Sequence, residues 1–303
     1  MSDYNINSIL LINKTVGPSS GFIINQLKRL IKPRKIGHAG TLDPFADGLL
    51  PVAVNEATKI LEYITDTDKE YIFTIQFGTE TDTQDNTGQI INTCDNKIIQ
   101  QQLEVSLPLF TGKITQIPSK FSAIKINGQR SYNLARANID FEVPSRQITI
   151  HSLKLLNFEE SSQQATLKVA CSKGTYVRTL GSDIAKNLGT YGYLIKLTRT
   201  KVGKFKLENA ILVENFKEVM HNANLNLGIP ISNTLDDIPV VELDALNSRR
   251  LYHGQQLNLN LELVDQTKAL ITYNQQPVAM IEYKGGNVKP LKVFNIIDFN
   301  LGE

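Results

Sequence analysis

The residues best suited to chemistry lie in one loop, GHAGTLDPFADG, which runs from Gly37 to Gly48. Pro44 fixes its own φ and disfavours helical backbone at Asp43, while the glycines allow turns that a side chain would forbid. Asp43 is therefore expected at a rigid, extended corner that leads into the apolar stretch 49–54. A carboxylate held in this way can cap the turn through nearby backbone N–H groups, or it can be a fixed reactive group.

A second candidate, Arg178, is the last residue of the sequence CSKGTYVR, which begins at Cys171. Gly174 permits a turn from strand to helix, and Leu180, Ile184 and Leu188 have the spacing of a buried helix face. Arg178 would then lie in the first turns of that helix, where a cation opposes the helix dipole. We therefore expect an anion to compensate Arg178.

Apolar spacing predicts the elements that position these two residues. Ser8–Lys14 has the pattern of a buried strand, and the helix after it begins at a capping Ser19 or Ser20 and ends at Pro33. The remaining predicted elements are helices over 57–64, 98–107 and 180–188 and strands over 71–77, 112–117, 148–158, 165–171 and 193–203.

Composition is that of an ordinary globular protein: 303 residues, 41% apolar and 20% charged, with a net charge of +2. This length predicts about two domains. The small net charge says little about partners, but three basic stretches without neighbouring acids fit one nucleic-acid face. They lie at 28–35, 120–136 and 196–206.

Cysteine and histidine usage excludes several classes of protein. Cys94 and Cys171 cannot form a disulfide framework, and the four histidines make no zinc-deaminase pattern. The acidic, turn-rich stretch 78–88 is interpreted as solvated turn chemistry, so no metal is expected. The N-terminus is not a signal peptide and no run is long enough to span a membrane, which predicts a cytoplasmic protein.

The segment GHAGTLDPFADGLLPVAVNEATK resembles the signature of bacterial TruB-type tRNA pseudouridine synthases, which isomerise the T-loop uridine of tRNA at position 55. The resemblance implies that Asp43 is the catalytic nucleophile and that it is the anion facing Arg178. The sequence DKEY is similar to the second motif of the family, which implies that Tyr71 stacks on the target base.

Further residues take substrate-binding roles from the same resemblance. Leu197, in a segment similar to the family's LRRTxxG, is the expected apolar wall against the base. His38 is a candidate for filling the gap left in the RNA, or else a hydrogen-bonding residue of the loop. Four more lie in matching motifs, with Lys14 also interpreted as a loop anchor: Lys14, Lys125, Tyr176 and Arg199. Departures from the family pattern are Asn13, Thr15, Ser119, Phe121 and Thr198.

The resemblance also implies a fold and an organisation. It predicts an α+β fold with a mixed, largely antiparallel central sheet flanked by helices, and a small C-terminal all-β PUA-like domain. The expected catalytic domain is 1–235, with an RNA-clamping insertion at about 118–146, and the PUA-like RNA-binding domain is 238–303. Residues 229–237 have the composition of a linker.

Pseudouridine formation breaks the N1–C1′ bond and joins C5 to C1′ without redox change, so no cofactor is implied. Asp43 must be ionised, and Arg178 would offset the burial that raises its pKa and aim it by a two-pronged contact. The expected partner is the T-arm of tRNA, with no membrane and no obligatory protein partner, and the expected state is a monomer.

Three other functions remain open at this point. A non-catalytic tRNA-folding chaperone would use the same pocket, and a guide-RNA-dependent synthase would need partner proteins. An aspartyl-phosphate enzyme built on Asp43 and Asp47 would require Mg²⁺ and normally a D-x-D arrangement, which the sequence lacks.

Overall fold

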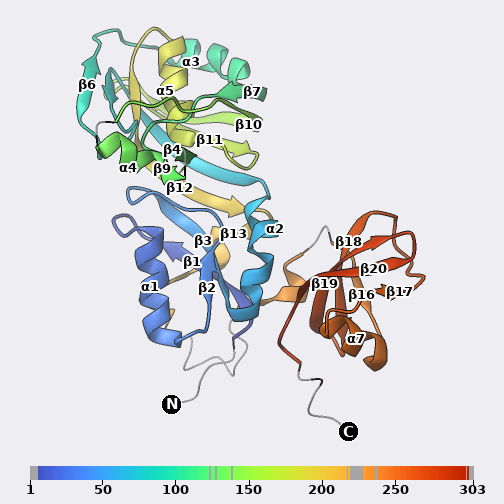
Figure 1. Ribbon diagram of the computed structural model, residues 1–303. Helices are drawn as coiled ribbons and strands as arrows, with labels where there is room; N and C mark the ends of the chain where they lie inside the picture. Colours follow the sequence, from blue (N-terminus) through green and yellow to red (C-terminus); the bar gives the residue numbers. More distant parts are fainter. Residues whose placement is uncertain are drawn as a thin grey trace.

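The computed structural model describes residues 6–122, 124–126, 128–137, 139–216, 218, 228–235, 238–297 and 299. An eleven-stranded sheet forms its main body, in the order β14-β1-β3-β12-β4-β11-β10-β7, with β13, β15 and β2 paired to β12, β1 and β3 (Figure 1). Its strands are β1 (Ser8–Lys14), β2 (Ile36–His38), β3 (Asp47–Val54), β4 (Lys69–Phe77), β7 (Gly112–Gln116), β10 (Arg146–Glu159), β11 (Gln164–Cys171), β12 (Gly192–Val202), β13 (Phe205–Lys206), β14 (Ile211–Leu212) and β15 (Ile229–Pro230).

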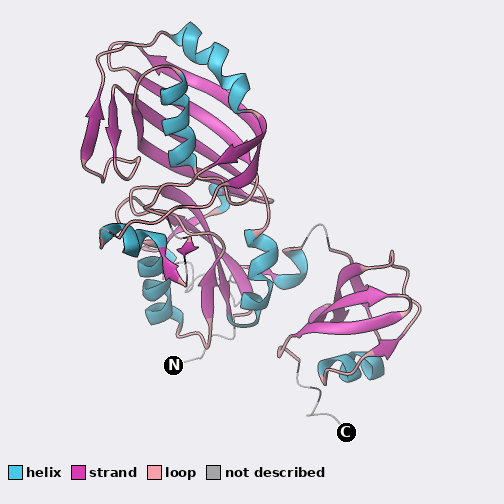
Figure 2. Ribbon diagram, turned by 45° about the horizontal axis from the view of Figure 1, so that its top comes forward, coloured by secondary structure: helices cyan, strands magenta, loops and turns pink. Residues whose placement is uncertain are grey.

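Most pairings in this sheet are antiparallel, and β1 with β14 and β3 with β12 are parallel. The predicted mixed, largely antiparallel sheet is therefore confirmed. Helices pack on the strands (Figure 2). They are α1 (Ser20–Ile31), α2 (Leu61–Thr65), α3 (Gln100–Ser106), α4 (Ser131–Arg136) and α5 (Val177–Asn187), with 3₁₀ turns η1 (Asn55–Ile60), η2 (Leu107–Phe110), η3 (Leu207–Asn209) and η4 (Ile231–Asn233). None of the helices in the described ranges has the length and apolarity needed to cross a bilayer.

Helix α1 illustrates how the sequence sets these bounds. The Ser19 side chain accepts a hydrogen bond from the Phe22 N–H at its start, as the capping rule predicts. The helix ends where Lys32 turns left-handed, with φ of 45°, immediately before Pro33. The predicted helix over 57–64 is instead the 3₁₀ turn η1 followed by the short α2, and η1 begins at Asn55, whose φ is 48°.

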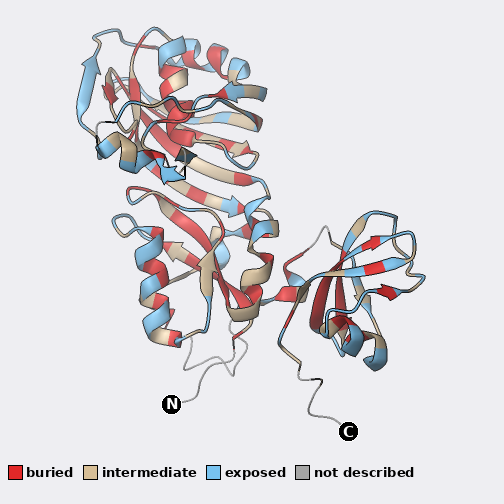
Figure 3. Cartoon of the chain, viewed as in Figure 1, coloured by how far each residue is buried: buried red, intermediate tan, exposed pale blue. Residues whose placement is uncertain are grey.

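In contrast to the outer strands β7 and β10, which carry exposed as well as buried residues (Figure 3), strand β1 is buried on both faces. Because successive side chains point to opposite faces, Leu10 and Ile12 join the core beneath α1, while Ile9 and Leu11 join a second apolar cluster. That second cluster also contains Leu270, Met280 and Phe294, from the C-terminal sheet. The two sheets therefore share this second apolar cluster.

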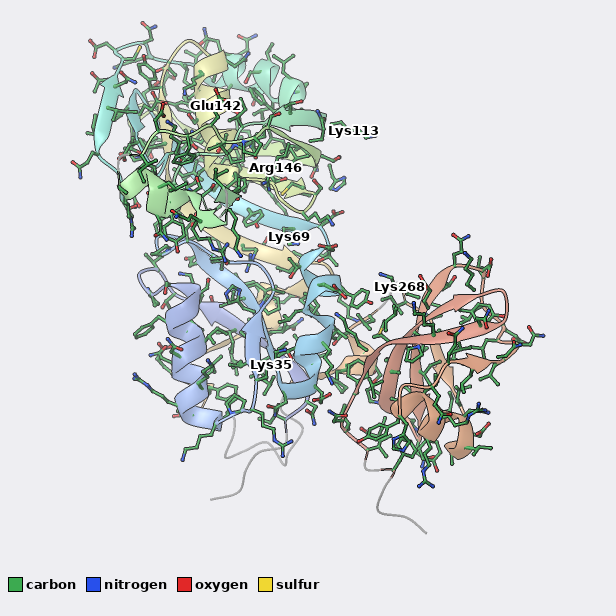
Figure 4. The ribbon with its side chains drawn as sticks, in the orientation of Figure 1. Lys35, Lys69, Lys113, Glu142, Arg146 and Lys268 are labelled. Carbon is green, nitrogen blue, oxygen red and sulfur yellow. The ribbon has the colours of Figure 1, made fainter. Side chains whose placement is uncertain are left out.

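The C-terminal sheet has the order β16-β18-β19-β20-β17. The helix α7 (Ala245–Tyr252) packs against it, so the C-terminal unit, predicted to be all-β, is not purely β. Its strands are β16 (Val240–Glu242), β17 (Leu257–Asn258), β18 (Thr267–Tyr273), β19 (Gln276–Lys284) and β20 (Asn287–Val293). Lys268 of β18 faces α2, with its Nζ 5.7 Å from the ring centre of Tyr63 (Figure 4).

The predicted linker over 229–237 is partly wrong. Ile229–Pro230 forms β15, antiparallel to β1, and the Ile229 side chain packs against the second apolar cluster. Asp236 and Asp237, at the junction of the two predicted domains, lie outside the described residues.

Two short hairpins complete the fold. One consists of β5 (Thr79–Thr81) and β6 (Ile90–Thr93), and its turn carries the acidic stretch. The other consists of β8 (Lys125–Ile126) and β9 (Gln129–Arg130), followed by α4. The second hairpin lies between β7 and β10 in sequence, in the predicted insertion of 118–146, and Figure 1 labels its strand β9 next to α4.

Candidate active site

A cavity of about 290 Å³ opens where β4 and β12 meet the Asp43 loop. Its size is at the lower end of the range for small-molecule sites, which suits one nucleobase. The walls come from four parts of the chain that are distant in sequence: 40–43 in the loop, Thr65, Lys69 and Tyr71 around β4, Leu197 and Arg199 on β12, and Ser172 with 174–178 at the start of α5.

Asp43 and Arg178 meet at this cavity. Arg178 Nε lies 3.0 Å from Asp43 Oδ2, so the anion that the helix-dipole argument required is present. The Arg178 side chain is only 7% exposed, whereas that of Asp43 keeps 39% exposure. The carboxylate is thus reachable from the cavity while its cation is buried behind it.

The predicted two-pronged contact between Asp43 and Arg178 is wrong. The guanidinium divides its nitrogens among several partners, because other acceptors surround it. Nη1 donates to the Thr83 carbonyl at 2.6 Å and to Asp85 Oδ2 at 3.2 Å, and Nη2 donates to the Phe121 carbonyl at 3.0 Å. Only Nε faces Asp43 in this arrangement.

Burial and charge act against each other on Asp43. Burial raises the pKa of its carboxyl above the ordinary value, Arg178 lowers it, Asp85 raises it and Lys14 lowers it, in that order of size. Ionised Asp43 therefore depends on the cation beside it. Removing that cation would move the pKa of Asp43 further up.

Sheet register brings Tyr71 to Arg199. Arg199 pairs with Tyr71 of β4 on one side and with Gly48 of β3 on the other. Arg199 also hydrogen-bonds the Tyr71 side chain, and burial raises the pKa of the Tyr71 hydroxyl. Tyr71 accordingly forms a fixed aromatic surface beside Asp43, with Leu197 on the same cavity wall.

The sequence of this chain matches known proteins over most of its length. Residues 28–177 match the family model described as TruB family pseudouridylate synthase (N terminal domain). The tRNA pseudouridine synthase B of Caulobacter vibrioides is 36% identical, over 96% of this chain and 97% of the relative. That of Rickettsia africae is 40% identical, over 98% of this chain and 83% of the relative. This chain belongs to the TruB family.

Solved structures agree in fold. An archaeal box H/ACA sRNP Nop10–Cbf5 complex aligns with a TM-score of 0.72 at 18% identity, covering 98% of this TruB-family chain and 88% of that chain. At this identity the likeness concerns the fold alone. It supports the pseudouridine synthase fold with a PUA-like C-terminal sheet.

Two basic residues predicted to bind substrate are buried supports of the site. Lys14 is fully buried, and its Nζ donates to the carbonyls of Thr15, Pro18 and Pro44 at 3.0, 2.9 and 3.4 Å. Substrate contact by Lys14 is therefore wrong, because no part of it reaches the surface. Its alternative interpretation as a loop anchor is confirmed.

Arg199 supports the same loop from the other side. It is 1% exposed, and it donates from Nε to the Leu49 carbonyl at 2.8 Å and from Nη2 to the Gly40 carbonyl at 2.9 Å. A Cβ at Gly40, whose φ is +79°, would lie 3.2 Å from Arg199 Nη1, so glycine allows this approach. Arg199 lines the cavity floor, but its guanidinium is occupied inside the protein rather than offered to an RNA phosphate.

The other predicted residues lie at or beyond the rim. Tyr176 lines the cavity, and its backbone N–H and carbonyl both bond the Gln116 side chain. His38 ends β2, half-buried, and burial lowers the pKa of its imidazole. Lys125 is exposed on β8, and neither His38 nor Lys125 is among the cavity residues. Their RNA contacts stay predictions.

Sequence reasoning missed two residues of the site. Asp85 was assigned to a solvated turn, yet it is buried and accepts from Thr87 N–H at 2.9 Å as well as from Arg178. Lys69 lines the cavity, in the junction region where Figure 4 labels it, and donates to the carbonyls of Thr65 and Thr67. Burial lowers the pKa of Lys69 to about 8. The alternation of β4 links Lys69 to Tyr71, two residues on, and is the signal that could have identified it.

The Lys14→Met substitution is expected to destabilise the fold without weakening tRNA binding. It removes the donor from the carbonyls of Thr15 and Pro18, before α1, and of Pro44, in the Asp43 loop. Leaving such buried acceptors unpaired costs about 1–3 kcal/mol. Urea unfolding measures the loss, and a filter-binding titration with tRNA measures affinity. A stable variant with weak tRNA binding would contradict the anchoring role.

Proposed function

We propose that this chain converts uridine 55 in the T loop of tRNA to pseudouridine, with Asp43 as the nucleophile and no cofactor. Membership of a pseudouridylate synthase family makes the chain an isomerase of RNA uridine. The observation that carries the assignment of residues is the Asp43 carboxylate, paired with buried Arg178 at the mouth of a base-sized cavity.

The base must leave the RNA loop before this carboxylate can reach its glycosidic bond. Extruding a nucleotide costs a few kcal/mol, and stacking on an aromatic ring returns roughly 1–3 kcal/mol. Tyr71 supplies that ring, and Leu197 supplies an apolar side chain on the same cavity wall. The cavity thus holds the uracil while its link to the ribose is changed.

Asp43 then acts on the nucleoside in its ionised form, at C1′, at C6 or by assisting glycal formation. The N1–C1′ bond breaks, the uracil rotates, C5 joins C1′, and the proton on C5 is lost while N1 gains one. Atoms and electrons balance within the nucleotide and water, so no oxidant or reductant enters. Arg178 keeps Asp43 ionised against burial, because a close cation favours the charged carboxylate.

We propose the same organisation as for the family: a catalytic domain over 1–235, an RNA-clamping insertion at about 118–146 and a PUA-like RNA-binding domain over 238–303. The enzyme is proposed to act as a cytoplasmic monomer on tRNA, without an obligatory protein partner. Exposed basic residues of the insertion support an RNA contact there: Lys120, Lys125 and Arg136. The Arg136 guanidinium carbon lies 5.8 Å from the ring centre of the partly exposed Tyr132.

The direct test incubates purified protein with unmodified tRNA and EDTA, and then maps pseudouridine by chemical modification and reverse transcription. We expect one pseudouridine, at position 55 of the T loop. An unmodified T loop under these conditions would contradict the proposal. A chaperone would bind and refold the tRNA in this experiment but leave position 55 as uridine.

Tyr71 variants test the stacking surface. Tyr71→Phe keeps the ring and loses the hydroxyl that Arg199 contacts, and it should retain more activity than Tyr71→Leu. Loss of stacking in Tyr71→Leu should lower the single-turnover rate by about 10- to 100-fold, the equivalent of the stacking energy. Rapid-quench measurement on T-loop RNA compares the two variants. Equal activity of the leucine and phenylalanine variants would show that stacking is not the role of Tyr71.

A further inference from the structure

The guanidinium of Arg178 has a partner that the reaction chemistry does not require. Its Nη2 donates to the backbone carbonyl of Phe121, at 3.0 Å. Phe121 belongs to the insertion between β7 and β10, whereas Nε and Nη1 serve Asp43 and Asp85. One buried side chain therefore connects the candidate nucleophile to the segment proposed to hold RNA.

The Phe121 carbonyl is itself held in place by neighbouring serines. The Ser119 hydroxyl accepts from the Phe121 N–H at 3.2 Å, and the Ser131 hydroxyl donates to the Lys120 carbonyl. The Ser131 N–H also donates to the Ile124 carbonyl, at 2.7 Å. Ser119 and Ser131 are both buried. Two side-chain hydrogen bonds thus fix the Lys120–Phe121 peptide, which immediately precedes the Arg178 acceptor, and on the other side the Ser122 carbonyl accepts from the Tyr132 N–H at 3.1 Å.

Arg178 needs the Phe121 carbonyl to keep its orientation. The guanidinium is rigid and planar, so fixing Nε, Nη1 and Nη2 leaves it no freedom to turn. If the insertion moved away, Nη2 would lose its acceptor in a site where the Arg178 side chain is 7% exposed. Because a buried donor strongly favours the paired state, docking of the insertion and alignment of Arg178 with Asp43 stabilise each other.

We propose that Phe121, through its backbone carbonyl, and Ser119 and Ser131, which hold that carbonyl, are positioning residues for Asp43 that act through Arg178. The insertion then does more than grip RNA, because its docked form completes the alignment of the catalytic pair. The proposal rests on the proposed function only for its readout in turnover.

Two substitutions, Ser119→Ala and Ser131→Ala, each remove one side-chain hydrogen bond to the peptide that precedes the Phe121 carbonyl. Ser106→Ala is the matched control, because Ser106 in α3 is also buried and its hydroxyl also donates to a backbone carbonyl, that of Leu103 at 2.7 Å. Thermal unfolding verifies that each variant is folded. Single-turnover rate on bound tRNA, tRNA affinity and the pH dependence of the rate are then measured.

We expect each test variant to lower the bound-state rate by about tenfold, as a small misplacement of a catalytic group does. Affinity for tRNA should stay within about twofold, because no phosphate contact is removed. The acidic limb of the rate profile should move to higher pH, since Asp43 loses part of the influence of Arg178 while Asp85 still opposes its ionisation. Lys14, Lys69 and Arg199, the other cations near Asp43, are unchanged in these variants.

The result that overturns the proposal is weaker tRNA binding with an unchanged bound-state rate and an unchanged acidic limb. A double-mutant cycle gives a second test: in an Arg178→Lys background, Ser131→Ala should cause no further loss, and additive losses would contradict action through Arg178. Titration of the Asp43 carboxyl by ¹³C NMR in RNA-free protein, wild type against Ser131→Ala, reports the coupling even where pseudouridine formation itself fails. An unshifted Asp43 titration rejects the proposal independently of turnover.

Discussion

Asp43→Asn is expected to lower the rate of pseudouridine formation by at least about a thousandfold, the scale of losses when a nucleophile is removed. The amide has nearly the shape of the carboxylate, so the corner before Pro44 should fold unchanged. Affinity for tRNA should remain, because Tyr71 and Leu197 still form the base cavity. Release of tritium from C5 of labelled uridine in tRNA measures the rate, since that proton leaves during the reaction.

Asp47→Asn provides the matched control for this loop. Asp47 begins β3, four residues after Asp43, and is not among the residues that line the cavity. The control should keep activity within a few-fold of wild type. If Asp43→Asn retained turnover near wild type, the assignment of Asp43 as nucleophile would be wrong, and an RNA-binding role for the pocket would be favoured.

The elements around this carboxylate could be predicted because their signals are local. Strand β1 and helix α1 follow from apolar spacing and a serine cap, and α5 follows from Gly174 and its apolar face. The need for an anion at Arg178 also came from local physics, the helix dipole. In each case the deciding residues lie within about ten positions of one another.

What could not be predicted depends on contacts between distant parts of the chain. Asp85 pairs with Arg178, 93 residues away, and nothing in the sequence of its own turn distinguishes it from Asp82, which stays partly exposed. Lys14 and Arg199 are of residue types usually found at the surface, but both are buried, because distant segments of the chain cover them: Pro44 contacts Lys14, and Gly40 and Leu49 contact Arg199. Burial of a basic residue thus depends on tertiary contacts, which the sequence pattern does not specify.

The shared core of the two sheets has the same origin. The family resemblance predicted an all-β C-terminal domain, but a sequence pattern cannot show which apolar face of that domain meets another sheet. Met280 and Phe294 pack into the cluster that contains Ile9 of β1. Lys59 Nζ also donates to the Val293 carbonyl across this interface. The C-terminal unit is thus attached by packing and by hydrogen bonds.

Arg178→Lys is expected to lower the bound-state rate by about 100- to 1,000-fold while tRNA affinity stays near wild type. Lysine keeps the charge but replaces a planar fork with a single ammonium, and misplacement of a catalytic group alone can cost about 100-fold. The ammonium cannot serve Asp43, Asp85 and the Thr83 and Phe121 carbonyls at once. Rapid-quench kinetics at saturating protein measures this rate separately from binding. Arg249→Lys, the same change at an exposed residue in the last turn of α7 and away from the cavity, is the control and should have little effect.

The pH profile of Arg178→Lys distinguishes electrostatic positioning from simple damage. Asp43 is active when ionised, so the rate is lost as the pH falls through its pKa. Burial already raises that pKa and Arg178 is the largest influence that lowers it. Weakening this contact must raise the pKa further, which shifts the acidic limb of the rate to higher pH, and raising the pH should recover part of the activity. A variant whose rate is low by the same factor at every pH would mean that Arg178 acts on the transition state and not on the ionisation of Asp43.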